Sequence, residues 1–154
     1  IQFSLNNITG FPHETRELAM TTVELNRKID ADNANIYSFV PFHGTPLRRL
    51  CEKEGLVGPE TIARALTDRP MLDMPQYPIT EIEGLKKCFI LYVKFPKNRW
   101  NEIRLAEENS DKGNRIYQDL KDECLDKYIT SPKDNPNSEL PASADLEYGI
   151  ATPT

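Results

Sequence analysis

Two short loops carry the residues whose chemistry first stands out in this 154-residue sequence. One runs through Gly10 and Pro12, and the other runs from Pro41 through His43 to Gly44. A glycine lets a ligand approach the backbone and a proline stiffens a loop, whereas histidine is the side chain that transfers protons near neutral pH. Either loop alone is most simply a turn. Two matched loops, each between a strand-like and a helix-like segment, together predict a ligand site, with His43 as its candidate catalytic residue.

The elements that position these loops follow from the hydrophobic pattern. Alternation of apolar and polar residues predicts strands over residues 1–9 and 34–40. Thr15 and Thr45 stand where helix N-caps are expected, and Pro46 suits a first helical position. Two strand–helix units in succession favour a parallel α/β sheet, because parallel strands need a helical crossover. The first helix should bury one stripe, made of Leu18, Thr22, Leu25 and Ile29.

Beyond residue 57 the pattern becomes more helical. A short helix is expected over residues 60–66, and an extended, proline-rich segment over residues 70–78. Thr80 and Glu83 have the spacing of a capping box and predict the start of a longer helix.

Two more helices are expected before the end of the chain, the first with Asn98 as its cap and the second with Tyr128 on its apolar face. Residues 130–154 are rich in Pro, Ser, Asn and Asp and too poor in apolar residues to offset their ordering entropy, so they are predicted to be disordered. The chain therefore divides into two β/α units over 1–57, a helical extension over 58–129 and this tail.

Composition narrows the function classes. A net charge of -5 and an isoelectric point near 5.1 argue against a nucleic-acid surface, which would show clustered Lys and Arg. The longest apolar run, residues 88–93, is far below the roughly 20 residues that cross a bilayer. Cys51, Cys88 and Cys124 lie far apart and suggest no disulfide framework, which favours a reducing compartment. A cytoplasmic protein without nucleic-acid partner or membrane span is expected.

Two sequence stretches resemble a known family. Residues 7–15 (NITGFPHET) look like the Ile-x-Gly-x-Pro-x-Glu-Thr strand and turn late in the barrel of radical S-adenosylmethionine enzymes. Residues 39–47 (FVPFHGTPL) look like the final strand of that barrel and its Pro-x-x-Gly-Thr-Pro-Leu loop. A weaker likeness, in residues 89–96 (FILYVKFP), is to members that carry an N-terminal cobalamin-binding domain. The resemblance covers residues 3–128.

The resemblance implies a nucleoside site at the two loops. Ile8 would pack on the adenine of S-adenosylmethionine, and Gly10 would let the chain pass close to the ligand, with Phe11 in the same turn. An inward amide of Asn6 or Asn7 would bond the ribose, and the pattern leaves open which of the two points inward, because neighbouring strand residues face opposite ways. Val40 and Pro41 would close the other side of the adenine.

The chain also departs from the family. The Cys-x3-Cys-x2-Cys run that holds a four-iron four-sulfur cluster does not occur in the sequence, and His13 stands where the family usually has glycine. The fold expected is therefore α/β, the C-terminal fragment of a partial (β/α)6 TIM-like barrel with two parallel strand–helix units. Its partners would be the N-terminal part of the same enzyme, carrying the cluster and cobalamin, and a small-molecule substrate.

Such a fragment would be inactive alone, and neither the substrate nor the reaction type can be inferred from these residues. In the whole enzyme the family chemistry is hydrogen abstraction by a 5′-deoxyadenosyl radical, often followed by methyl transfer from cobalamin. One alternative is a non-catalytic α/β and helical module that binds a protein partner. Another is a piece of a different barrel, such as a metal-dependent hydrolase, although the sequence lacks clustered His, Asp and Glu ligands.

Overall fold

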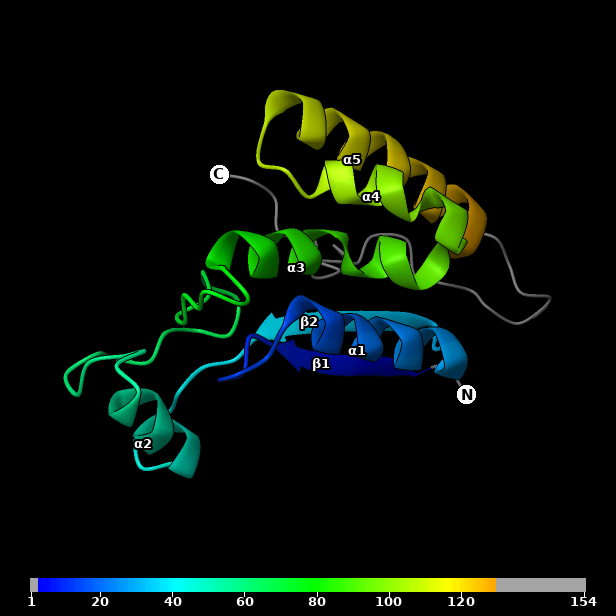
Figure 1. Cartoon of the computed structure of the whole chain (residues 1–154). Coiled ribbons are helices and arrows are strands. Elements are labelled where there is room, and N and C mark those ends of the chain that lie inside the picture. Colours follow the sequence, from blue (N-terminus) through cyan, green and yellow to red (C-terminus); the bar gives the residue numbers. More distant parts are fainter. Residues whose placement is uncertain (1–2, 130–154) are drawn as a thin grey trace.

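The computed structural model of the chain describes residues 3–129 and is shown in Figure 1. In chain order its elements are β1 (Ser4–Thr9), α1 (Arg16–Ile29), β2 (Asn33–Ser38), α2 (Pro46–Lys53), α3 (Ile79–Lys94), a 3₁₀ turn (Lys97–Arg99), α4 (Trp100–Ala106), α5 (Asp111–Cys124) and a π-helical turn (Leu125–Ile129). The predicted disorder of residues 130–154 lies outside the described residues.

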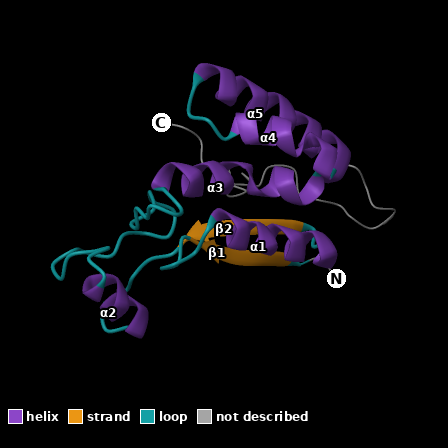
Figure 2. Ribbon diagram, viewed as in Figure 1, coloured by secondary structure: helices purple, strands orange, loops and turns teal. Residues whose placement is uncertain are grey.

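The two strands form a parallel sheet, as the sequence predicts (Figure 2). Ser4 lies opposite Asn33 and Thr9 opposite Ser38. Beyond the last pair the Phe39 amide still donates to the Thr9 carbonyl at 2.7 Å, so both strands leave the sheet side by side at their carboxyl ends. The α/β class with parallel strands is confirmed, whereas membership of a barrel stays a prediction.

Local sequence signals explain the first two helix starts. The Thr15 hydroxyl accepts from the Leu18 amide at 3.3 Å, and the Thr45 hydroxyl accepts from the Arg48 amide at 3.2 Å, so both predicted N-caps are confirmed. Pro46 occupies the first position of α2, where its missing N–H has no cost.

Three other helix predictions are wrong. Helix α3 begins at Ile79 instead of after a Thr80 cap, because the Asp73 carboxylate accepts from the Ile79 amide at 3.0 Å and so caps it from an earlier turn. Asn98 lies inside the 3₁₀ turn, and α4 starts after Arg99 without a side-chain cap. Residues 60–66 form a loop, with the Ile62 side chain largely exposed.

Helix α1 buries a neighbouring side and not the one predicted. Leu18 and Leu25 are each 55% exposed and Ile29 is 41% exposed, whereas Ala19 and Val23 are fully buried. The large aliphatic residues suggested the buried stripe, but α1 packs closely on α3 and β1, and the narrow interface takes the smaller side chains. The apolar stripe is thus left on the surface of the described residues.

Helix α3, not α2, covers β2. In Figure 1 α3 runs above the sheet, while α2 lies away from it beyond the carboxyl ends of the strands. The second strand–helix unit expected from the sequence is therefore corrected: the helix that follows β2 directly does not pack on the sheet. Its place is taken by α3, a helix that is continuously apolar over residues 88–93 and also contacts α1, α4 and α5.

One continuous set of buried apolar side chains joins the two halves of the described chain. It includes Val23 and Ile36 from the first half and Phe89, Leu91 and Leu120 from the second. The division at residue 57 stays a prediction, and the core runs across it. Within residues 3–129, no helix has both the length and the apolar character that a membrane crossing requires.

Candidate functional site

The two faces of the sheet differ in burial. Thr9 and Ser38 are buried on the face that α1 and α3 cover, which we call the covered face. The opposite face, here the open face, carries Asn6 and Ile8 on β1 beside Asn35 and Tyr37 on β2, and these side chains are exposed or half-buried. Ile8, 45% exposed and directly opposite Tyr37, gives the open face an apolar surface at the carboxyl end of the strands.

The structure resolves the alternative between Asn6 and Asn7. The Asn7 amide faces α1, where it donates to Asn26 Oδ1 at 3.1 Å and receives the Asn26 Nδ2 donor at 2.9 Å. Asn7 also donates to the Asn35 carbonyl at 2.9 Å, so its hydrogen bonds are used inside the protein. Asn6 lies on the open face, where its Oδ1 accepts from Asn35 Nδ2 at 3.1 Å. Asn6 is therefore the amide that a ligand on the open face can reach.

The first loop owes its shape to a glycine and a carboxylate. Gly10 has φ of +85°, a left-handed conformation that favours glycine, and a Cβ at this position would lie 3.3 Å from Ile82 Cδ1. The Glu14 carboxylate accepts from the Gly10 amide, from the Phe11 amide at 3.2 Å and from the Thr9 hydroxyl at 3.0 Å. Glu14 thus holds the turn closed, and the sequence analysis missed this role.

His13 occupies a glycine-like position in this loop. Its φ is +66°, which explains why a glycine at this position suits the same turn. Its Nε2 lies 3.0 Å from Glu54 Oε1, just after α2, so the contact joins the first loop to the end of that helix.

The second loop combines a buried start with an exposed tip. Val40 and Pro41 are buried, and His43 and Gly44 are exposed. The rings of Phe11 and Phe39 are 4.9 Å apart at their centroids, so the two loops touch where they leave the sheet. The structure therefore brings together the predicted residues Gly10, Phe11 and Val40, and leaves His43 at the outer tip; its catalytic role stays a prediction.

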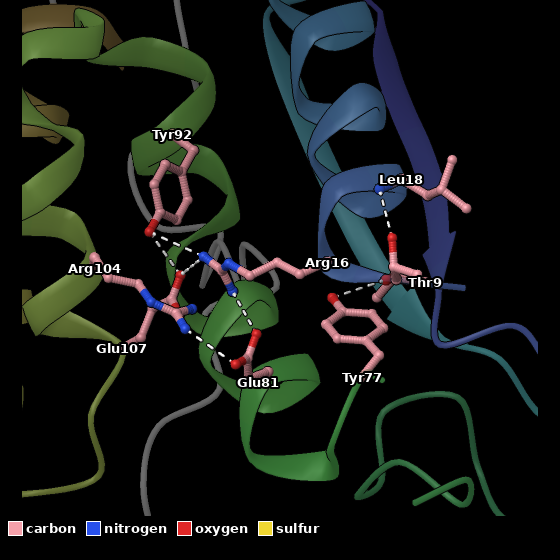
Figure 3. Close-up of polar contacts among 9 residues, drawn as sticks. Thr9, Arg16, Leu18, Tyr77, Glu81, Tyr92, Arg104 and Glu107 are labelled. Carbon is pink, nitrogen blue, oxygen red and sulfur yellow. Dashed lines mark hydrogen bonds and ion pairs between the residues drawn. The ribbon is translucent and has the colours of Figure 1, made fainter. Parts of the chain in front are cut away.

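Behind the loops, on the covered face, lies a polar layer (Figure 3). The Thr9 and Tyr77 hydroxyls are 3.3 Å apart. Burial raises the pKa of Tyr77 to about 12, so this phenol stays protonated at neutral pH. Met74 and Tyr77 are buried here and fasten the proline-rich segment to the sheet.

An ion-pair network continues this layer into the helices. Arg16 donates to Glu107 at 2.6 Å, and the Tyr92 hydroxyl donates to the same carboxylate at 2.7 Å. Arg104 bridges Glu107 and Glu81, at 2.6 and 3.2 Å (Figure 3). These bonds tie the start of α1 to α3 and α4. Apart from the i,i+3 pair of Arg104 and Glu107, the partners are far apart in the chain, so no local sequence signal announces them.

The class of molecule that these features define is an α/β protein with a parallel sheet, whose two strand exits meet at one edge. In open α/β sheets, ligands generally bind outside the carboxyl ends of the strands. Searches of protein-family models, of curated proteins and of solved structures found no match to this chain.

Proposed function

We propose that this chain is the C-terminal part of a radical S-adenosylmethionine enzyme and supplies one side of its adenosine pocket. The observation that carries the proposal is the parallel pairing that sets the two family-like loops side by side at one sheet edge. An antiparallel arrangement would have put them at opposite ends.

Each predicted residue has a chemical role in this proposal. Ile8 and Tyr37 offer an apolar surface of the kind on which a base stacks. Asn6 on the same face offers an amide to the ribose hydroxyls. Gly10 turns the chain out of β1 with its left-handed backbone, while the buried Val40 and Pro41 form the wall behind the ligand. The open face thus carries both kinds of group that a nucleoside needs.

The described cysteines do not fit an iron–sulfur cluster. Cys51, Cys88 and Cys124 are buried on three different helices, α2, α3 and α5. Burial raises the pKa of Cys88 to about 12 and that of Cys124 to about 11, whereas cluster ligands are thiolates. In this proposal the cluster and any cobalamin are held by the N-terminal part of the enzyme, and with S-adenosylmethionine they supply its radical chemistry.

The exposed stripe on α1 favours a second candidate, a non-catalytic module that binds a protein. Leu18, Leu25 and Ile29 form an apolar face that no described element covers. In the enzyme proposal a preceding strand–helix unit of the same polypeptide covers this stripe. In the module proposal the partner is a separate protein and the open face binds no nucleoside, so nucleoside binding separates the two.

The proposal is tested by titrating the 154-residue chain with S-adenosylhomocysteine and following its backbone amide resonances. Half a pocket should bind with a Kd of about 1 mM, equivalent to about 4 kcal/mol, with shifts confined to residues 6–11 and 40–44. Ile8→Asp should weaken binding at least about tenfold, because it puts a charge on the stacking surface. Ile62→Asp, a change at an exposed loop residue outside the site, should leave the Kd unchanged.

Absence of shifts at about 10 mM ligand, or equal shifts in Ile8→Asp, would count against the nucleoside site. The family assignment has its own test. The complete reading frame that contains this chain should encode Cys-x3-Cys-x2-Cys upstream of Ile1, and a reading frame without it removes the radical chemistry from the proposal.

A further inference from the structure

Arg48 is a buried charged residue on the helix that follows the second loop. It lies on α2 and is only 1% exposed. An arginine is seldom buried to this degree unless its charge is paired and its N–H groups are bonded. The groups that accept hydrogen bonds from Arg48 therefore show which parts of the chain it holds together.

The guanidinium of Arg48 joins three separate stretches of backbone and side chain. Its Nη1 donates to the Pro41 carbonyl at 3.2 Å, and its Nη2 donates to the carbonyls of Gly58 and Pro59 at 2.8 and 3.1 Å. Its Nε donates to Glu52 Oε1 at 2.5 Å, one turn along the same helix. Pro41 comes directly after the buried end of the second strand exit, and residues 58–59 follow α2.

The planar shape of the guanidinium accounts for this arrangement. Its five N–H donors point outward in one plane, so one group can bond acceptors on several sides. A lysine in the same place has a single nitrogen at the end of its stem and cannot reach the Pro41, Gly58 and Glu52 acceptors together. The partly exposed Glu52 carboxylate supplies the opposite charge, so burial of Arg48 leaves no uncompensated ion.

Arg48 also connects the second loop to α2, a helix that does not itself pack on the sheet. Since α2 does not pack on the sheet, the second loop gets no support from the helix–sheet contact that usually fixes a strand exit. The bond to the Pro41 carbonyl connects that exit directly to α2, and the Gly58 and Pro59 bonds connect α2 to the chain that returns toward α3.

We infer that Arg48 is a positioning residue, which holds residues 41–44 in the geometry that the second side of the adenosine pocket requires. The identity of the ligand in this inference rests on the proposed function. The loop geometry itself can be measured without any ligand. Arg48 touches neither the open face nor the loop tip, so it acts through the Pro41 carbonyl.

The test compares Arg48→Lys and Arg48→Met in the full chain by amide hydrogen exchange, thermal unfolding and S-adenosylhomocysteine titration. In Arg48→Lys we expect exchange of residues 42–45 to accelerate at least about tenfold, while exchange in β1 and α3 stays near wild type, and the Kd to rise about tenfold. Lys53→Met removes an exposed charge from the same helix and should change neither quantity. Glu52→Gln keeps an oxygen acceptor for Arg48 Nε but removes the compensating charge, so its loop protection should lie between those of Lys53→Met and Arg48→Met.

The outcomes separate the two claims. Unchanged exchange of residues 42–45 in Arg48→Lys overturns the positioning role, whatever the ligand does. If Arg48→Lys exchanges faster but binds S-adenosylhomocysteine with an unchanged Kd, Arg48 holds the loop without affecting the pocket. That result also overturns the positioning role. Faster exchange in a chain whose wild type binds no S-adenosylhomocysteine refutes the proposed function and leaves the loop contact standing.

Discussion

Arg27 should be among the side chains whose loss most weakens the packing of α3 on the rest of the protein. Helix ends leave their last carbonyls without partners inside the helix. At the end of α3, Arg27 Nη1 donates to the carbonyls of Tyr92, Val93 and Phe95 at 2.7, 2.9 and 2.6 Å. The guanidinium also lies 5.7 Å from the centre of the Trp100 ring. One side chain of α1 thus caps the helix that covers β2.

The magnitude follows from what Arg27→Met leaves behind. Arg27 Nη1 carries two hydrogens, so its three contacts count as about two charge-assisted hydrogen bonds. The three carbonyls belong to buried residues at the end of α3. Losing a charged hydrogen bond and stranding a buried acceptor each cost about 1–3 kcal/mol, so we expect a loss of about 3 kcal/mol in the free energy of unfolding. For a domain of this size that corresponds to a fall in Tm of about 10 °C.

Urea unfolding followed by far-ultraviolet circular dichroism measures this loss, with an unchanged m-value showing that the denatured state is comparable. Lys28→Met, at the exposed neighbouring position, is the matched control for removing a charge from α1. Arg27→Lys should fall between the two, because it keeps the charge but not the paired donors. An Arg27→Met chain within about 0.5 kcal/mol of the Lys28→Met chain would refute the reasoning, since that is the range of an ordinary surface change.

Two further predictions concern α3 and the polar layer behind the loops. A Cβ at Gly84 would lie 2.8 Å from Glu107 Cβ, so Gly84→Ala should push α3 from α4 and cost about 1–3 kcal/mol in urea unfolding, although alanine favours helix; a stabilised variant would contradict the packing. Tyr77, with its ordinary pKa of 10.0 raised to about 12, keeps its proton when the unfolded chain has lost it, so stability should fall between these two pH values. Tyr77→Phe should make that fall shallower in unfolding measurements across the range, and an unchanged slope would show that the phenol does not contribute.

The parts of the fold that follow from local rules could be predicted from sequence. The two strands, predicted over 1–9 and 34–40, are found at 4–9 and 33–38 and are parallel as predicted. The strand positions and the caps at Thr15 and Thr45 depend on residues close together in the chain. The same holds for Gly10, whose left-handed backbone matches its place in a strand-to-helix loop.

What could not be predicted depends on partners far away in the chain. The buried side of α1 was set by α3, more than fifty residues on, and not by the larger aliphatic residues of α1 itself. Glu14 and Arg48 look like ordinary charged residues of a helix and its flank, because only the folded backbone shows which amides and carbonyls they meet. The sequence could not decide between Asn6 and Asn7. Alternation shows that neighbouring strand residues point to opposite faces, but it does not show which face the helices cover.

Because the helix that covers β2 arrives from downstream, the stretch between Ser38 and Ile79 contributes no helix to the covered face, and only its end, with Met74 and Tyr77, packs there. It leaves and re-enters at the same end of the strands, where a bound molecule would sit. Substitutions in its mostly exposed part, residues 60–69, can therefore alter the surface at that end with little effect on the packing of α1 and α3. The architecture thus places its exposed connection at the carboxyl ends of the strands and its packed helices over the covered face.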